Sequence, residues 1–312
     1  MPTEVLIAGK LPQFTLDKLE GRFTCHRLRE APDRGKLLAE IAERVRGIAT
    51  TGFDGASAEL IAALPKLEII SCFGVGVDAI NLPAARARGI TVTNTPDVLN
   101  DDVADLGVGL MLSAARAIPQ GDRYVRAGRW EAEGMMPLQT KFSGKTVGIL
   151  GLGRIGKVIA RRCEAFDCTI LYHGRNPQDG VAYRYCADLV EMARDADFLC
   201  AICPGGEATR NIVDRPVLEA LGPKGILVNV ARGSVVDETA LIEALQSGAL
   251  GGAGLDVYEA EPRVPSALRE LNNVVLLPHI GSASEETRLQ MEQRVLANLQ
   301  AFIERGELLT PL

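Results

Sequence analysis

The sequence predicts an α/β protein made of two Rossmann- or flavodoxin-like domains, each with a parallel sheet. The chain has 312 residues, which is long for a single core and sufficient for two. Short apolar segments alternate with amphipathic helical segments, and this alternation is typical of parallel sheets covered by helices. The alternation is interrupted once, by the polar segment Arg126–Phe142, and resumes at Lys145. We therefore expect the active-site cleft between two domains.

The first series of elements precedes the interruption. We expect its strands at Glu4–Ala8, Arg22–Arg27, Gly47–Thr50, Leu67–Cys72 and Ile90–Asn94. Helices should lie between them, for instance at Ala56–Leu64 and Leu82–Arg88, and a longer helix should span Asn100–Arg116. The segment Arg126–Phe142 lacks clear periodicity and indicates an arm or loop.

The second series gives the other domain. Its strands are expected at Thr146–Leu150, Thr169–His173, Phe198–Ile202, Ile226–Val230, Gly252–Leu255 and Val274–Leu277. Its helices are expected at Ile155–Ala165, Ala187–Ala193, Arg215–Leu221 and Glu238–Ser247, and a final helix at about Glu285–Arg305.

Charge and composition exclude several classes of partner. The formal net charge of −6 gives no electrostatic reason to expect nucleic acid or an anionic membrane as a partner. The apolar run Phe198–Cys203 is too short to span a bilayer, and MPTEVLIAGK does not resemble a signal peptide, so we expect a cytoplasmic protein. The seven cysteines are odd in number and irregularly spaced, which argues against a disulfide framework. Cys200 and Cys203 form a CxxC, but without a second pair or a nearby histidine we expect buried strand residues and no metal site.

A glycine-rich motif marks the expected cofactor site. Gly151, Gly153 and Gly156 follow a predicted strand and open a predicted helix, as in the G-x-G-x-x-G pattern of dinucleotide-binding domains. The glycines allow a tight turn and a close approach of the pyrophosphate, and the helix N-terminus offers free N–H groups. The alternative is a glycine-rich turn without a ligand.

The end of the next strand indicates which dinucleotide binds. NAD sites usually carry an acidic residue there, but this chain reads Leu171-Tyr172-His173-Gly174-Arg175. The guanidinium of Arg175 is permanently charged and suits a 2′-phosphate, so we expect NADPH to be preferred, with NADH possible. The alternative is a solvated surface arginine.

His279 is the best candidate for an acid/base among the three histidines, because it follows a strand at its C-terminal end, where ligands of such sheets bind. His26 adjoins no carboxylate motif, and His173 lies at the expected adenosine end. Arg232 and Glu261 also follow strands of the same domain, so an arginine, a carboxylate and a histidine should converge beside a nicotinamide.

Four stretches together resemble the D-isomer-specific 2-hydroxyacid dehydrogenase family over nearly the whole chain. They are SCFGVGVDAINL, GILGLGRIG, VNVARGSVVDE, and GAGLDVYEAEP with LPHIGSAS. TNTPDVLNDDVADL and LYHGRNP are similar to its glyoxylate/hydroxypyruvate reductase branch. CPGGEAT departs from the family form, because Gly205 and Gly206 replace a Leu-Thr pair.

The resemblance implies reduction of small 2-keto acids to 2-hydroxy acids. His279 would protonate the keto oxygen, Glu261 would orient the imidazole, and Arg232 would bind the substrate carboxylate. The implied substrate contacts are Val75, Gly76, Arg232 and His279. The implied cofactor contacts are Gly151, Gly153, Arg154, Ile155, Gly156, Arg175, Cys203, Pro204, Thr209, Val230, Asp256 and Val103. Val103 could instead be helix core, and Asp256 could instead satisfy local backbone donors.

The resemblance also implies the domain organisation and the oligomer. Residues 1–97 and 284–312 would form a substrate-binding domain, and residues 98–283 the dinucleotide-binding domain. A helix and arm at about 100–142 would build a homodimer, and Trp130 would either reach the neighbour's site or pack in the interface.

Other functions remain open from sequence alone. A dinucleotide-sensing binding protein, such as a corepressor-like relative, would keep the fold without significant turnover. Phosphoglycerate dehydrogenases often carry a regulatory domain, for which no chain remains, and formate and D-lactate dehydrogenases more often carry the missing acidic residue. The natural substrate cannot be chosen from the sequence.

Overall fold

The protein is described by a computed structural model covering residues 2–312, which divide into two compact units. Unit 1 comprises residues 2–99 together with Ser284–Leu312, and unit 2 comprises Asn100–Ala283. The fold class predicted from the sequence is confirmed, since both units contain a parallel sheet covered by helices.

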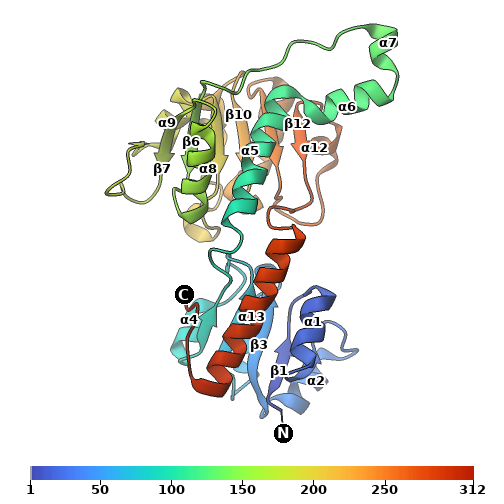
Figure 1. Cartoon of the computed structure of the whole chain (residues 1–312), viewed down its shortest axis with the longest axis vertical. Helices are drawn as coiled ribbons and strands as arrows, with labels where there is room; N and C mark the ends of the chain where they lie inside the picture. The colour runs from blue at the N-terminus through green and yellow to red at the C-terminus, as the bar shows by residue number, and fades with distance from the viewer. Residues whose placement is uncertain (1) are drawn as a thin grey trace. The chain divides into compact units, whose positions relative to one another are not determined.

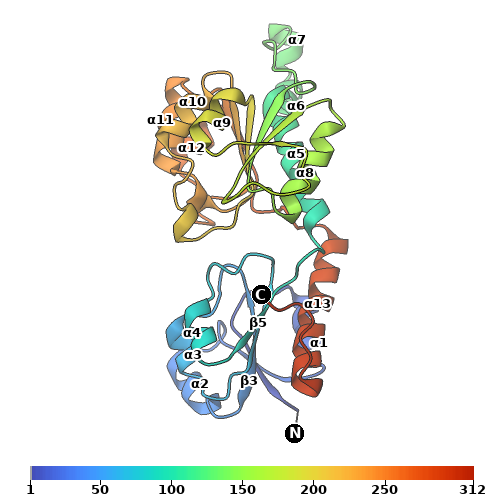
Figure 2. The same ribbon diagram turned by 90° about the vertical axis from the view of Figure 1, so that its left-hand side faces the viewer.

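Unit 1 holds a five-stranded parallel sheet in the order β2-β1-β3-β4-β5. Its strands are β1 (Glu4–Ile7), β2 (Thr24–Arg27), β3 (Val45–Thr51), β4 (Ile69–Phe73) and β5 (Thr91–Thr93). Its helices are α1 (Gln13–Glu20), α2 (Arg34–Ile41), α3 (Ala58–Ala62), α4 (Leu82–Ala87) and α13 (Glu285–Arg305). Figure 2 shows α2, α3 and α4 on one face of the sheet and α1 with α13 on the other. The last helix of the chain therefore completes the core begun by the first ninety-nine residues.

Unit 2 holds a seven-stranded parallel sheet in the order β12-β11-β10-β9-β6-β7-β8. Its strands are β6 (Thr146–Leu150), β7 (Thr169–His173), β8 (Arg184–Tyr185), β9 (Phe198–Ala201), β10 (Ile226–Asn229), β11 (Gly252–Leu255) and β12 (Val274–Leu276). The chain runs outward from β6 in one direction and from β9 in the other. Ligands of open α/β sheets bind at such a reversal, beyond the carboxyl ends of the strands.

Helices cover both faces of this second sheet (Figure 2). They are α5 (Asn100–Arg116), α8 (Arg154–Glu164), α9 (Leu189–Asp195), α10 (Arg215–Leu221), α11 (Glu238–Ser247) and α12 (Ser266–Glu270). Aspartates start three of them: the side chains of Asp188, Asp214 and Asp237 accept N–H bonds from the first turns of α9, α10 and α11. Such caps satisfy N–H groups that a helix cannot bond internally, and they fix where each strand-to-helix loop ends.

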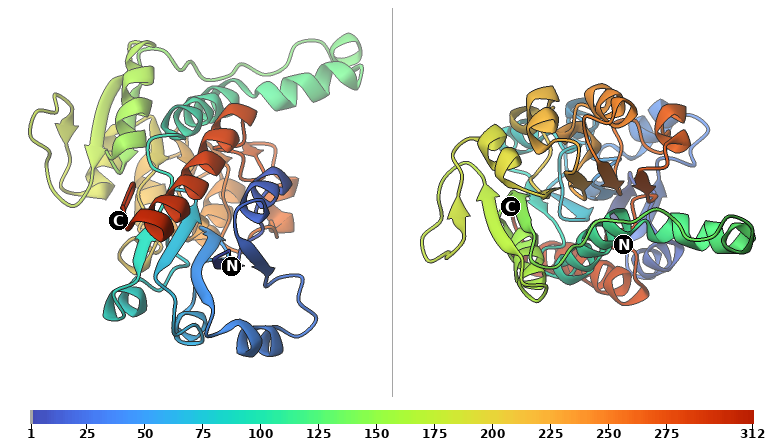
Figure 3. Two further views of the ribbon diagram at one scale, coloured as in Figure 1. Left: turned by 60° about the horizontal axis from the view of Figure 1, so that its bottom comes forward. Right: turned by 90° about the horizontal axis from the view of Figure 1, so that it is seen from above.

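Two further helices, α6 (Ile118–Arg126) and α7 (Arg129–Glu133), project from unit 2 as an arm (Figures 1 and 3). The prediction of an irregular segment at Arg126–Phe142 was wrong in part, because α7 lies within it. Neither helix carries an apolar stripe toward a core, since α7 buries no residue and α6 buries only Tyr124. Within residues 2–312, no helix is both long and apolar enough to cross a membrane.

Candidate active site

His279 lies in the loop that follows β12, and its backbone is held in an unusual conformation. Its φ is +54°, in the left-handed region that residues with a Cβ rarely adopt. The His279 N–H donates to the carbonyl of Asp256 at 2.9 Å. The Asp256 carboxylate in turn accepts the N–H groups of Ile280 at 2.7 Å and Gly281 at 2.8 Å. Asp256 thus fixes the backbone of His279 and of the two residues that follow it.

The imidazole of His279 is paired with Glu261. Nδ1 of His279 lies 2.9 Å from Oε2 of Glu261, and Oε1 of Glu261 accepts the N–H of Tyr258 at 3.0 Å. A carboxylate only accepts, so Nδ1 carries a proton and Nε2 is the ring nitrogen that would exchange one with a substrate. The two side chains are 27% and 17% exposed, so a small molecule can reach the pair while bulk water is partly excluded.

Asp256 and Tyr258 each form a backbone hydrogen bond with one member of this pair. Asp256 is 2% exposed, and burial raises the pKa of its carboxyl, while the N–H groups of Ile280 and Gly281 act in the opposite direction. Burial likewise raises the pKa of Tyr258, whose hydroxyl donates to the carbonyl of Leu277 at 2.9 Å. The sequence predicted Asp256 as a cofactor contact, with the satisfaction of local backbone donors as the alternative, and the structure shows these local hydrogen bonds. Their consequence for the backbone of His279 was not predicted.

Arg232 follows β10, the neighbour of β11 in the sheet. Its Nη1 donates to the carbonyl of Ala231 at 2.7 Å, and its own carbonyl accepts from Asn229 Nδ2 at 2.9 Å. The next residue, Gly233, packs so closely that an added Cβ would lie 1.9 Å from the carbonyl carbon of Tyr258. The loops that carry Arg232 and Glu261 are therefore in direct contact.

A mainly apolar pocket of about 290 Å³ borders the histidine–glutamate pair. Its lining residues are Tyr258, Glu261, Pro262, Val264, Arg269, Leu276, Leu277, Pro278 and His279.

The glycine-rich turn joins β6 to α8 as the motif predicts. Gly151 has φ +102°, and a Cβ there would lie 2.7 Å from the backbone of Cys203, so only glycine fits between the ends of β6 and β9. At Gly153, the N-cap of α8, an added Cβ would meet no atom within 4 Å. This leaves open space in front of the first turn of α8, which is the geometry that a pyrophosphate requires. Arg154 is exposed, and Ile155 is half-buried in the same turn.

The other residues expected along the cofactor path are either buried near the ends of α5 and β10 or lie in the loop after β9. Val103 on α5 is 8% exposed, and it lies with Asp256 against Gly281, where an added Cβ would meet Val103 at 3.5 Å and Asp256 Oδ2 at 3.1 Å. Val230 is buried beyond β10. After β9, the Thr209 hydroxyl donates to the carbonyl of Pro204 at 2.6 Å and closes that loop on itself.

Val75 and Gly76 belong to unit 1 and follow β4. The carbonyl of Val75 accepts from Asn94 Nδ2 at 2.9 Å. Within residues 2–312, the N–H groups of Val75 and Gly76 donate no hydrogen bond. Both are half-buried, so this loop can offer two N–H donors to an anion.

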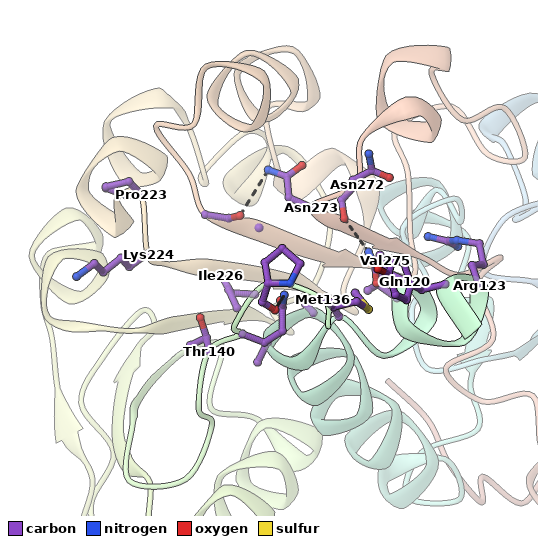
Figure 4. Close-up of a pocket in the computed structure, with 18 of the residues that line it drawn as sticks. Gln120, Arg123, Met136, Thr140, Pro223, Lys224, Ile226, Asn272, Asn273 and Val275 are labelled. Atoms are coloured by element: carbon purple, nitrogen blue, oxygen red, sulfur yellow. Dashed lines mark hydrogen bonds between the residues drawn. The ribbon is translucent and has the colours of Figure 1, made fainter. Parts of the chain in front are cut away.

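A second cavity of unit 2 lies elsewhere (Figure 4). It measures about 660 Å³ and is bordered by Ile226 and Gly252, at the starts of β10 and β11, and by residues of the arm such as Arg123 and Met136. Gln120 Nε2 donates to the carbonyls of Asn272 at 2.8 Å and Val274 at 3.1 Å across one side of it. Because it lies at the amino ends of the strands, it is separate from the histidine–glutamate pair.

Comparison with known proteins agrees with this geometry. Residues 108–281 match the family model described as D-isomer specific 2-hydroxyacid dehydrogenase, NAD binding domain. The chain belongs to this family. It is 49% identical over 308 residues to glyoxylate/hydroxypyruvate reductase A of Arabidopsis thaliana, covering 99% of this chain and 98% of that protein. It is equally similar to hydroxyphenylpyruvate reductase of Plectranthus scutellarioides, at 49% identity and the same coverage.

Solved structures of other family members share the fold over the whole chain. The NADPH-dependent glyoxylate/hydroxypyruvate reductase of Sinorhizobium meliloti, solved with NADP and malonate, has a TM-score of 0.94 at 47% identity. That match covers 100% of this chain and 97% of the other. The NAD binding domain of the family therefore falls within unit 2 of this chain.

Proposed function

We propose that this protein reduces small 2-keto acids to 2-hydroxy acids with NADPH, and that glyoxylate and hydroxypyruvate are its substrates. The similarity to reductases of these acids supports the assignment. The observation that carries it is the hydrogen-bonded pair of His279 and Glu261, which lies beyond the carboxyl ends of β11 and β12 in a dinucleotide-binding unit.

Each residue of the candidate site is proposed to have one role in the reduction. A reduced nicotinamide, when bound, supplies the hydride to carbon 2 of the substrate. His279 donates the proton from Nε2 to the keto oxygen, and Glu261 holds the ring in place by accepting from Nδ1. Arg232 binds the substrate carboxylate and polarises the carbonyl. The N–H groups of Val75 and Gly76 bind the same carboxylate.

The cofactor is proposed to be NADPH in preference to NADH. Arg175 is exposed and makes no ion pair or hydrogen bond with any residue in 2–312, so its guanidinium is available to a 2′-phosphate. Gly151, Gly153, Arg154, Ile155 and Gly156 would hold the pyrophosphate. The proposed path beyond them is lined by Val103, Cys203, Pro204, Thr209, Val230 and Asp256.

The test is the oxidation of NADPH or NADH with glyoxylate, hydroxypyruvate, pyruvate, phenylpyruvate and hydroxyphenylpyruvate, for the wild type and His279→Ala. We expect rapid NADPH oxidation with the first two acids and a loss of at least about 100-fold in the variant. If hydroxyphenylpyruvate were reduced fastest, the substrate preference would instead match that of hydroxyphenylpyruvate reductase, the relative from Plectranthus scutellarioides. Tight cofactor binding with no turnover of any keto acid would favour a dinucleotide-sensing protein.

We further propose a homodimer formed through the arm. The arm exposes large apolar side chains, with Trp130 at 61%, Met135 at 84% and Leu138 at 95% exposure. Large apolar side chains exposed together on one segment are typical of a protein–protein interface, and a second copy would cover them. Leu138→Glu should shift the molar mass measured by light scattering toward the monomer, whereas Leu289→Glu, on α13 of unit 1, should leave it unchanged. An unchanged mass in both variants would contradict this interface.

Trp130 is proposed to reach the neighbouring subunit's site. Trp130→Ala should then lower kcat/KM while the dimer stays intact. An unaltered kcat/KM would assign Trp130 to interface packing.

We propose the cytoplasm as the location, because all seven cysteines are free thiols, as expected in a reducing compartment. Cell fractionation with an antibody to the protein would test this.

A further inference from the structure

The loop after β7 carries Arg175 and is fixed at both ends. We call residues 174–178 the selectivity loop; it lies near the edge of the sheet, where β7 pairs with the edge strand β8. Arg175 and Asn176 are exposed at its centre. The loop has no helix or strand of its own, so its shape depends on contacts with the residues around it.

Two tyrosines hold the ends of the selectivity loop. The hydroxyl of Tyr185 on β8 donates to the carbonyl of Gly174 at 3.1 Å. The hydroxyl of Tyr172 on β7 accepts the N–H of Gln178 at 2.8 Å. The two rings also pack on each other with centroids 5.3 Å apart. Tyr172 is only 2% exposed, so the pair is anchored in the core of unit 2.

Gln178 connects the selectivity loop to the glycine-rich turn. Its Nε2 donates to the carbonyl of Leu152 at 2.7 Å. Leu152 lies between Gly151 and Gly153, in the turn that faces the pyrophosphate. Three side chains therefore fix the selectivity loop relative to this turn, each through a hydrogen bond to the backbone: Tyr172, Gln178 and Tyr185.

We propose that Tyr172, Gln178 and Tyr185 are positioning residues that determine the preference for NADPH over NADH. This inference rests on the proposed function, in which Arg175 binds the 2′-phosphate. An arginine on an unrestrained loop would lose conformational freedom on binding, and a loop already held in place avoids that cost. The three residues hold the backbone of the loop, and Arg175 alone supplies the charge. Their effect should therefore be confined to ligands with a 2′-phosphate.

The test compares the binding of 2′,5′-ADP and 5′-AMP by calorimetry, because these differ by the 2′-phosphate and need no turnover. Tyr185→Phe removes the hydroxyl and keeps the ring. It should weaken 2′,5′-ADP about 3- to 10-fold and leave 5′-AMP within about 2-fold. The kcat/KM ratio of NADPH to NADH should fall by the same factor, with kcat at saturating NADPH unchanged.

Three further variants make the comparison specific. Tyr183→Phe removes a hydroxyl from the same segment between β7 and β8. Because that hydroxyl interacts with Glu164 on α8, the affinities for 2′,5′-ADP and 5′-AMP should both be unchanged. In an Arg175→Ala background, Tyr185→Phe should have no further effect, because it acts through Arg175. Gln178→Met should reproduce the loss seen in Tyr185→Phe.

The outcomes separate this inference from the proposed function. A wild type that prefers 2′,5′-ADP, with an undiminished preference in Tyr185→Phe and Gln178→Met, would overturn the inference and leave the function intact. Equal losses for both nucleotides would also overturn it, since they would indicate general damage to the fold. A wild type that binds both nucleotides equally would overturn the NADPH assignment together with the inference.

Discussion

At the scale of single residues, the contacts that fix His279 in place distinguish it as the candidate acid/base. Neutral histidines are common on protein surfaces, but His279 has its ring fixed by Glu261 and its backbone by Asp256. A side chain must be within hydrogen-bonding reach of its substrate atom before its protonation state matters. Asp256 should therefore control activity by keeping the loop of His279 in its left-handed conformation.

Asp256→Asn tests this role. An amide offers one oxygen where the carboxylate offers two, so its NH2 group would face the N–H of Ile280 or Gly281. Leaving one buried donor unpaired should cost about 1–3 kcal/mol in the free energy of unfolding, and kcat should fall by at least about 10-fold.

The matched control for this substitution is Asp237→Asn. Asp237 caps α11, and asparagine caps a helix as well as aspartate does, so its stability and kcat should stay near those of the wild type. Chemical denaturation and steady-state kinetics on both variants would decide. Equal behaviour of the two variants would remove the positioning role of Asp256.

At the scale of elements, periodic and capped segments could be predicted from the sequence and others could not. The bounds expected for α5, β6, β7 and α13 match the structure, because each combines a clear apolar pattern with a clear start or end. The bounds expected for α10, α11 and β11 match as well, and the other expected elements differ by one or two residues at one or both ends. The elements not named in advance are α1, α2, α6, α7, β8 and α12.

The missed elements share a physical cause. Most of them are short or bury few residues, and α7 and β8 are too short to show an apolar period that distinguishes them from loops. For the candidate site, motif residues such as Arg232, Glu261 and His279 could be proposed from their places after strands. The contacts of Asp256 and Tyr185 could not, because they depend on backbone carbonyls and N–H groups brought together only by folding.

Gly233→Ala tests how closely the loops after β10 and β11 must pack. The added methyl would overlap the backbone of Tyr258 at 1.9 Å and separate the loops that carry Arg232 and Glu261. We expect a loss of stability of at least about 1–3 kcal/mol, with a larger fractional loss of kcat/KM.

Gly109→Ala is the same substitution in α5, where an added Cβ meets no atom within 4 Å. It should raise stability by up to about 1 kcal/mol, because alanine favours a helix over glycine. A Gly233→Ala protein as stable and active as the wild type would show that the two loops need not touch.

At the scale of the whole molecule, stability depends on the last helix closing a unit that the first residues begin. α13 packs on β3, β4 and α1, and its residue Glu292 is buried at 3% exposure. Oε2 of Glu292 has no hydrogen-bond partner within residues 2–312. Burial raises the pKa of this carboxyl, with Asp17 adding to the effect and Lys18 opposing it. The folded state therefore favours the protonated acid.

The raised pKa of Glu292 determines how its contribution to stability changes with pH. A group whose pKa is raised on folding stabilises the protein below its unfolded pKa, and this stability is lost as the pH rises through the folded value. Glu292→Gln mimics the protonated acid at every pH. The variant should therefore unfold at a temperature about 2–4 °C higher than the wild type at neutral pH, with the difference disappearing in acid.

Glu4 provides the opposite case in the same unit. Burial alone would raise its pKa, but hydrogen bonds and charge from Arg44 and His26 hold the pKa of Glu4 below its ordinary value. Its contribution is present above the unfolded pKa and is lost as the pH falls through the folded one. Glu4→Gln should therefore lower the unfolding temperature at neutral pH, where Glu292→Gln raises it. Thermal unfolding of both variants from pH 4 to pH 8 measures the two signs side by side, and a neutral-pH loss in Glu292→Gln would mean that the buried carboxylate has a stabilising partner.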